Sequence, residues 1–142
     1  MKVSSILTAK GGFVASVNPE TTVSGLLATL AEHKIGAVVV TDASGGLVGI
    51  VSERDVARAG HAHGAGVMEL PMSEIMTKVV VTCEPQTDTA ELMQLMTDRR
   101  VRHIPIVDDG EMVGIVSIGD IVKARLAELE TERDALQAYI SS

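Results

Sequence analysis

The sequence predicts a mixed α/β fold of the α+β type, built from two copies of one β-α-β-β-α unit. The first observation is an internal repeat, since the run Val-Gly-Ile-Val-Ser at residues 48–52 returns unchanged at 113–117. In each copy the serine is followed three positions later by an aspartate, Asp55 or Asp120. Self-similarity of this kind indicates one structural unit that has been duplicated. A single unit would leave its sheet half covered, so we expect the two copies to pack through their sheets about a pseudo-twofold axis.

The second observation is the extent of the duplication, which reaches well beyond the repeated run. Residues 35–42 align with 101–108, and Leu26 aligns with Leu92. The copies differ in length in their turns, where surface connections tolerate insertions. We therefore divide the chain into a first repeat with its C-terminal linker, residues 1–66, and a second repeat with a C-terminal helix, residues 67–142.

Each copy is expected to begin with a short strand, followed by a helix at residues 22–33 or 89–99. Apolar residues in the first of these helices recur at the helical period and form one stripe. The residues of the stripe are Val23, Leu26, Leu27 and Leu30.

A β-hairpin is expected after this helix in each copy. Its strands are residues 37–41 and 47–51 in the first copy, and 104–107 and 112–116 in the second, with an Asp/Gly turn between them. These runs are almost continuously apolar, which predicts strands that are buried on both faces. The second helix of each copy begins at the repeated serine, and the Ala- and Gly-rich stretch 57–71 contains the end of one such helix and a linker.

Composition limits the core, the environment and the partners. Hydrophobic residues make up 46% of the chain and aromatic residues only 1%, so the core is expected to consist of Val, Ile, Leu, Ala and Met. This high apolar content suggests that some apolar surface is covered in an oligomer. The formal net charge of −7 argues against nucleic-acid binding, which needs a basic surface. No run approaches the roughly 18 apolar residues of a membrane span, no signal peptide is evident, and the single Cys83 fits a reducing cytoplasm.

The repeated Ser-x-x-Asp pair has two interpretations. In the first it is a capping box, in which the serine and the aspartate satisfy backbone N–H groups at the start of a helix. In the second, the helix N-terminus binds an anion such as phosphate, and the aspartate accepts hydrogen bonds from adjacent hydroxyls such as a ribose diol. Gly49 and Gly114 would then permit close approach of a backbone. The residues alone leave both interpretations open.

Other reactive side chains favour structural roles. His61 and His63 lie in an Ala/Gly-rich segment with no Cys or paired carboxylate nearby, so no metal site is predicted. Cys83 has no obvious base beside it and is interpreted as a passive small side chain, with redox sensing as the alternative. No Ser-His-Asp or Cys-His constellation is evident, so we expect no catalysis and no catalytic cofactor.

Three sets of residues relate the chain to a known family. They are residues 72–77 (Met-Ser-Glu-Ile-Met-Thr), residues 100–108 (Arg-Val-Arg-His-Ile-Pro-Ile-Val-Asp) and the two Gly-x-Val-Ser-x-x-Asp junctions. With them, nearly the whole chain resembles the tandem cystathionine β-synthase (CBS) domain pair, or Bateman module, as found in stand-alone bacterial and organellar proteins. The resemblance implies a cleft between the repeats that holds an adenosine-type ligand such as AMP, ADP, ATP, NAD(H) or S-adenosylmethionine. It does not imply catalysis.

The resemblance also implies two nucleotide sites, each combining the Ser/Asp pair of one repeat with the backbone pocket of the other. The first site comprises Ile50, Ser52, Arg54, Asp55, Thr77, Val79, Val101, Arg102 and His103. The second comprises Ile115, Ser117, Asp120, Thr8, Lys10, Phe13, Ile35 and Gly36.

Roles within these sites are likewise implied by the resemblance. The two aspartates hold ribose, the two serines bind ribose or phosphate, and the backbone at residues 8–13 and 77–79 contacts the adenine edge. Arg54, Arg102 and His103 reach toward phosphates, although a satisfied, partly buried imidazole is the rival interpretation of His103. The first repeat has Gly-Ala where the second has Arg102-His103. This asymmetry argues against equal occupancy of the two sites and leaves two alternatives, one nucleotide per chain or one longer dinucleotide along the cleft.

The C-terminal segment predicts a long helix with a narrow apolar seam. The seam residues are Val122, Leu126, Leu129, Leu136 and Ile140, interrupted by Arg133. So narrow a seam suits helix pairing across a dimer, and the alternative is packing on the helix's own domain. Two-fold dimers are the commonest oligomers, and the CBS resemblance implies disc-like dimers, so we favour a homodimer.

The main functional hypothesis is a cytoplasmic, non-enzymatic regulatory module. In it, binding of an adenosine nucleotide shifts the packing between the repeats, and a regulated partner protein, which the sequence does not identify, responds to the change. The alternative is a structural or protein-interaction dimer without a nucleotide ligand, in which the Ser/Asp pairs only cap helices. A small enzyme that acts on a nucleotide is disfavoured.

Overall fold

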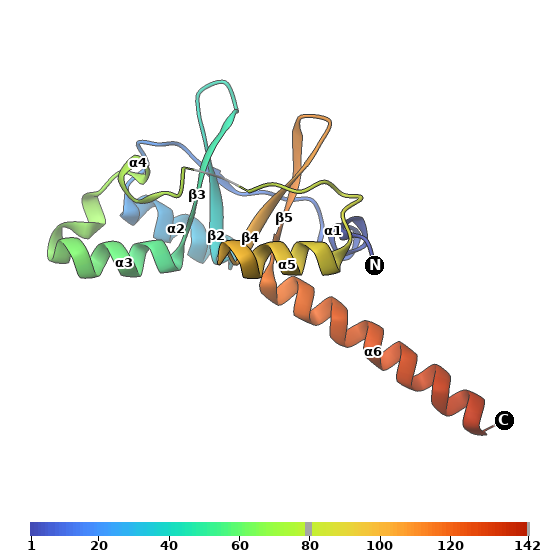
Figure 1. Ribbon diagram of the computed structural model, residues 1–142. Helices are drawn as coiled ribbons and strands as arrows, with labels where there is room; N and C mark the ends of the chain where they lie inside the picture. The colour runs from blue at the N-terminus through green and yellow to red at the C-terminus, as the bar shows by residue number, and fades with distance from the viewer. Residues whose placement is uncertain (79–80, 142) are drawn as a thin grey trace. The chain divides into compact units, whose positions relative to one another are not determined.

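The chain folds into two compact units of mixed helix and strand (Figure 1). The computed structural model describes residues 1–78 and 81–141, so the predicted site residue Val79 lies outside the described residues. One unit, here called the Asp55 unit, comprises Phe13–Val81. The other, here called the Asp120 unit, combines Met1–Gly12 with Thr82–Ser142. The mixed α/β fold expected from the sequence is confirmed.

The Asp55 unit contains a three-stranded sheet in the order β1-β2-β3. β1 (Ser16–Val17) pairs in parallel with β2 (Ala37–Thr41), and β2 pairs antiparallel with β3 (Leu47–Ser52). The helices of this unit are α2 (Val23–His33), α3 (Glu53–His63), the 3-10 helix η1 (Gly64–Glu69) and α4 (Met72–Ile75).

The Asp120 unit is built around the antiparallel pair β4 (His103–Asp108) and β5 (Glu111–Ser117). Cys83 forms a parallel bridge to Ile106, at the place where the other unit has β1. Burial raises the pKa of the Cys83 thiol, which agrees with a passive side chain. The helices of this unit are α1 (Val3–Lys10), α5 (Thr89–Arg99) and α6 (Ile118–Ser141).

α6 is the longest helix and runs out beyond the β4–β5 hairpin of its own unit (Figure 1). Ile121, near its start, is buried, whereas the seam predicted from the sequence is exposed. No helix in the described parts of the chain is long and apolar enough to cross a membrane.

Aligned side chains form the cores of the two units. Leu26 of α2 and Leu92 of α5 are both fully buried, and each packs in a core without aromatic rings. The buried hydrophobic side chains of the described residues are all Val, Ile, Leu, Ala or Met, as the composition predicted. Phe13, in contrast, is 65% exposed.

Each unit includes the opening segment of the other repeat. α1 opens the first repeat but belongs to the Asp120 unit, where the Val3 N–H donates to the Thr87 carbonyl at 2.9 Å. α4 lies at the start of the second repeat but belongs to the Asp55 unit, where the Met72 N–H donates to the Thr21 carbonyl at 2.8 Å. Val3 and Met72 are both 0% exposed. The division into repeats 1–66 and 67–142 stays a prediction about the duplicated sequence, and the compact units cross it.

The two hairpins turn by different means. In the β4–β5 turn, Asp109 and Gly110 have φ of 51° and 80°, the positive values that a tight type I′ turn requires. In the β2–β3 turn, Asp42 Oδ1 accepts hydrogen bonds from the Ser44 and Gly46 N–H groups at 3.0 and 2.8 Å. The bond from the Ser44 hydroxyl is the main cause that lowers the pKa of Asp42. The predicted Asp/Gly turns are confirmed.

Two expectations about the elements need correction. Residues 37–40 of β2 and the middle of β4 are buried, but β3 and β5 are buried at alternate positions, so burial on both faces is wrong for those two strands. The stretch 57–71 contains the end of α3, as expected, and residues 64–69 of its linker form η1, which packs on α2. The predicted element order also lacked α1 and α4, which are too short for a periodic pattern to identify.

Gly49 allows a close approach of backbone, and its replacement by alanine is expected to destabilise the protein. A Cβ at this position would lie 2.7 Å from Met76 Sδ and 3.0 Å from the Thr77 carbonyl oxygen. We expect Gly49→Ala to lower the free energy of unfolding in urea by about 1–3 kcal/mol, as overpacking does. The control is Gly60→Ala in α3, where nothing lies within 4 Å of the added atom, and which should raise stability by about 0.5–1 kcal/mol. Equal effects of the two substitutions would contradict the packing argument.

Candidate functional site

The first candidate half-site lies where β3 ends and α3 begins, in the Asp55 unit. Ser52 is the N-cap of α3 and forms a capping box with Asp55. Asp55 Oδ2 accepts hydrogen bonds from the Ser52 backbone N–H at 2.8 Å and from the Ser52 hydroxyl at 3.1 Å. Both residues are partly exposed. The capping interpretation is therefore confirmed for this copy, and it leaves the carboxylate within reach of solvent.

A backbone segment lies beside the same strand end. The Ile50 N–H donates to the Thr77 carbonyl at 3.1 Å, and the Thr77 N–H donates to the Ile50 carbonyl at 2.9 Å. This antiparallel bridge brings Thr77 against β3, next to Gly49. Ile50, Ser52, Asp55 and Thr77, which were predicted to share the first site, thus lie in one compact unit.

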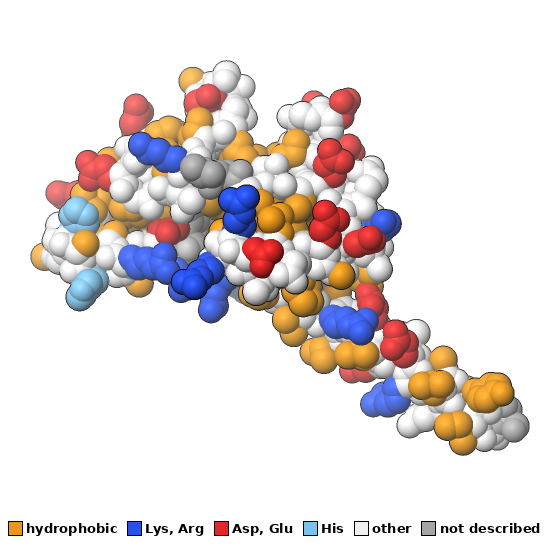
Figure 2. Space-filling model, viewed as in Figure 1, with side chains coloured by type: hydrophobic (Ala, Val, Ile, Leu, Met, Phe, Trp, Pro, Cys, Tyr) orange, Lys and Arg blue, Asp and Glu red, His pale blue; other side chains and the backbone are white. Residues whose placement is uncertain are grey.

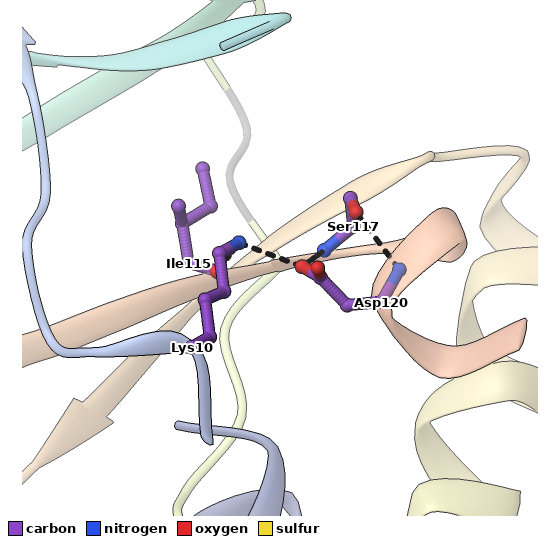
Figure 3. Close-up of polar contacts among 4 residues, drawn as sticks. All are labelled: Lys10, Ile115, Ser117 and Asp120. Atoms are coloured by element: carbon purple, nitrogen blue, oxygen red, sulfur yellow. Dashed lines mark hydrogen bonds and ion pairs between the residues drawn. The ribbon is translucent and has the colours of Figure 1, made fainter. Parts of the chain in front are cut away.

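The second candidate half-site lies where β5 ends and α6 begins, in the Asp120 unit (Figure 3). Asp120 Oδ2 accepts from the Ser117 backbone N–H at 2.8 Å, and the Asp120 N–H donates to the Ser117 hydroxyl oxygen at 3.1 Å. These reciprocal bonds are a capping box. The duplicated motif therefore caps a helix in both units.

Lys10, the last residue of α1, gives the second half-site a cation. Its Nζ lies 2.6 Å from Asp120 Oδ2 and donates to the Ile115 carbonyl at 2.7 Å (Figure 3). Burial raises the pKa of Asp120, but the Lys10 and Ser117 hydrogen bonds and the Lys10 charge lower it further, so its pKa lies below the ordinary 3.8. The carboxylate is accordingly ionised at neutral pH.

Two further predicted residues accept hydrogen bonds, through their backbone carbonyls, from the first N–H groups of α3 and α6. The Gly36 carbonyl accepts from the Glu53 N–H of α3 at 3.1 Å, and the aligned Arg102 carbonyl accepts from the Ile118 N–H of α6 at 2.9 Å. Gly36 therefore lies beside the Ser52–Asp55 pair within its unit. The Arg102 side chain is exposed.

The remaining predicted site residues are divided between the two units. In the Asp55 unit, Phe13 packs its ring 4.9 Å from that of His33, Arg54 is exposed and Ile35 is partly buried. In the Asp120 unit the remaining residues are Thr8, Val101 and His103. Each predicted site draws on residues from both units, and their joint use stays a prediction.

An open groove of about 550 Å³ lies elsewhere in the Asp120 unit. α5 and α6 supply most of its lining, including Met93, Gln94, Ile121 and Arg125. None of the predicted nucleotide-site residues lines it.

Sequence reasoning placed Lys10 in the second site but missed its bond to Asp120. A difference between the two repeats in the sequence partly indicates that Lys10 has a special role. The alignment that pairs Ser4 with Ser73 and Ile6 with Ile75 also pairs Lys10 with Val79, so only one repeat has a cation at this position.

Comparison with known proteins agrees with the fold and the duplicated junctions. The family model described as CBS domain matches residues 12–62 and again residues 72–127. The chain therefore belongs to the CBS domain family and contains two copies of the domain. The resemblance noted from the sequence is confirmed.

Relatives and solved structures include other CBS-domain proteins. The mitochondrial CBS domain-containing protein CBSX3 of Arabidopsis thaliana is 36% identical over 146 residues, covering 97% of this chain and 71% of its own. The crystal structure of ATU1752 from Agrobacterium tumefaciens is 45% identical with a TM-score of 0.86, covering 88% of this chain and 99% of its own. The CBS domain pair of protein MJ0100, solved in complex with 5′-methylthioadenosine and S-adenosyl-L-methionine, is 26% identical with a TM-score of 0.77, covering 87% and 98%.

Proposed function

We propose that this chain is a regulatory module that binds an adenosine-type ligand and passes its ligand-bound state to a partner protein. The observation that carries the proposal is the duplicated Ser–Asp junction, with Asp55 and Asp120 each held in the first turn of a helix at the end of a strand. An ionised carboxylate in this place accepts hydrogen bonds from a ribose diol. The adjacent helix N-terminus favours a phosphate. AMP, ADP, ATP and NAD(H) combine these two groups.

The family relationship supports an adenosine ligand. The MJ0100 domain pair binds 5′-methylthioadenosine and S-adenosyl-L-methionine, and both ligands contain the adenosine diol. In the proposed assignment Asp55 and Asp120 hold ribose, while Arg54, Arg102 and His103 face phosphates. Backbone groups around Thr8–Phe13 and around Thr77 contact adenine.

The proposed module is cytoplasmic, non-catalytic and homodimeric. The observation in favour of a dimer is the exposed seam of α6, where Val122, Leu126 and Leu129 are 50%, 56% and 43% exposed. Ligand binding then acts through the equilibrium between two packing states. It shifts this equilibrium by no more than the difference between its affinities for the two states.

Thermal unfolding with a panel of ligands tests the proposed function. A ligand at 100 times its dissociation constant adds about 2.7 kcal/mol to the stability of the folded state. We expect one of AMP, ADP, ATP, NAD⁺, NADH and S-adenosylmethionine to raise the unfolding midpoint by about 5 °C or more. The combined Asp55→Ala and Asp120→Ala variant should lose this shift.

A control is needed because these substitutions also remove helix caps, at about 1 kcal/mol each. Asp42→Ala removes a carboxylate that holds the β2–β3 turn, away from the candidate half-sites. This control should lower the midpoint but keep the full ligand shift. A ligand shift that survives in the double aspartate variant would refute the assignment of ribose to Asp55 and Asp120.

A protein-interaction dimer without nucleotide is the second candidate function. It is favoured by the complete capping boxes, which give both Ser–Asp pairs a structural role without any ligand. This candidate predicts no shift with any ligand of the panel and a loss of stability alone in the aspartate variants.

A further inference from the structure

The two half-sites differ in the group that donates a hydrogen bond to the aligned isoleucine carbonyl of the strand, Ile50 or Ile115. In the Asp55 unit the Ile50 carbonyl accepts from the Thr77 backbone N–H at 2.9 Å. In the Asp120 unit the aligned Ile115 carbonyl accepts from Lys10 Nζ at 2.7 Å. The same ammonium lies 2.6 Å from Asp120 Oδ2 (Figure 3). One side chain thus bonds both the strand backbone and the carboxylate of this half-site.

The Lys10–Asp120 pair is better shielded than a comparable ion pair of the same unit. The side chains of Lys10 and Asp120 are 34% and 23% exposed, whereas those of Lys2 and Asp88 are 56% and 58% exposed. Water and salt therefore screen the Lys10–Asp120 pair less. Asp55 is in none of the ion pairs found among the described residues.

A ribose diol would compete with this ammonium for the same carboxylate. Hydrogen bonds from a charged donor are roughly twice as strong as those from a neutral one, so hydroxyls alone are the weaker partners of Asp120. Among the described residues of its unit, the Asp55 carboxylate has no such competitor, since the hydrogen bonds that it accepts come from Ser52.

We propose that Lys10 is an internal latch, which occupies the Asp120 half-site and directs the first adenosine ligand to the Asp55 half-site. The inference rests on the proposed function and adds to it an order of occupancy. Lys10 then acts as a competitor for the ligand at Asp120 rather than as a contact to it. The sequence argued against equal occupancy because of the Arg102-His103 pair. The latch gives the difference between the two sites a physical cause in another residue, Lys10.

Isothermal titration with AMP and with adenosine tests the latch. In the unchanged protein we expect one site to bind at least about tenfold more tightly than the second. This ratio of dissociation constants is what the loss of one charged hydrogen bond produces. Lys10→Met keeps the length of the side chain and removes its charge. It should tighten the second site about tenfold and leave the first unchanged. The matched control, Lys2→Met, removes the exposed ion pair with Asp88 and should change neither affinity.

A second measurement follows the latch without any ligand. Carbon NMR of the Asp120 carboxyl group should give a pKa below 3.8 in the unchanged protein, and a higher value in Lys10→Met. Lys2→Met should leave that pKa where it was. An equal pKa in Lys10→Met and in the unchanged protein would overturn the bond on which the latch depends.

The titration outcomes separate the latch from the proposed function. Two equal sites in the unchanged protein, or weaker binding in Lys10→Met, would overturn the latch and leave the nucleotide module intact. Weaker binding would show that Lys10 contacts the ligand. An absence of binding by every variant would refute the proposed function, and the latch with it.

Discussion

Replacement of Val3 by aspartate is expected to destabilise the Asp120 unit, most of which comes from the second half of the sequence. Val3 is 0% exposed in α1, and α1 packs in the Asp120 unit with β5 and α6. The change removes a buried apolar side chain, worth about 1.5–3 kcal/mol, and places a carboxylate where water is excluded. We expect the free energy of unfolding to fall by about 3–5 kcal/mol.

Hydrogen exchange measures which segments are destabilised by the substitution. Local opening is reported segment by segment, so Val3→Asp should remove protection from α5, β4 and β5 more than from β2 and β3. The control is Ser5→Asp, which adds the same charge at an exposed position in the first turn of α1, where a negative charge is favourable. Loss of protection mainly in residues 16–52 would show that α1 belongs with the rest of the first repeat.

Glutamates at Leu126 and Leu129 are expected to separate the proposed dimer into monomers. Both side chains lie on the exposed seam of α6, and hydrophobic side chains are visible along this helix in Figure 2. Burial of each leucine across an interface would contribute about 1.5–3 kcal/mol. The double substitution should therefore raise the dissociation constant by at least about 100-fold, and sedimentation equilibrium should give the mass of one chain.

The matched control adds the same two charges to the opposite face of the helix. Ala127 and Ala138 are exposed and lie away from the seam at 3.6 residues per turn. Their double replacement by glutamate should leave the dimer intact. Equal masses for both variants, whether monomeric or dimeric, would remove the seam as the site of association, and a monomeric unchanged protein would refute the proposed dimer itself.

Local features of the fold were predictable from the sequence because they depend on neighbouring residues. The period of Leu26 and Leu30 marks α2, and the serine before each acidic first turn marks the start of α3 and α6. The Asp109-Gly110 pair marks a turn because both residues adopt positive φ. Each of these patterns acts within a few residues, where the sequence alone specifies the geometry.

The candidate site was predictable in its aspartates and serines but not in their surroundings. The repeat identified Ser52, Asp55, Ser117 and Asp120, and both pairs form the bonds that a capping box requires. The ion pair between Lys10 and Asp120 joins residues 110 positions apart in the chain. No pattern of spacing indicates such a contact, because it depends on where α1 packs.

The sequence by itself determined the duplication, the type of each main element and the family to which the chain belongs. Repeated residues and periodic apolar positions are sufficient for that, since they reflect backbone geometry that is fixed locally. Only the tertiary structure decided that α1 joins the Asp120 unit and α4 the Asp55 unit. The reason is that a short helix is stable only where its few apolar side chains and unpaired N–H groups find partners. The N–H groups of Val3 and Met72 bond to Thr87 and Thr21, and these partners lie far away in the sequence.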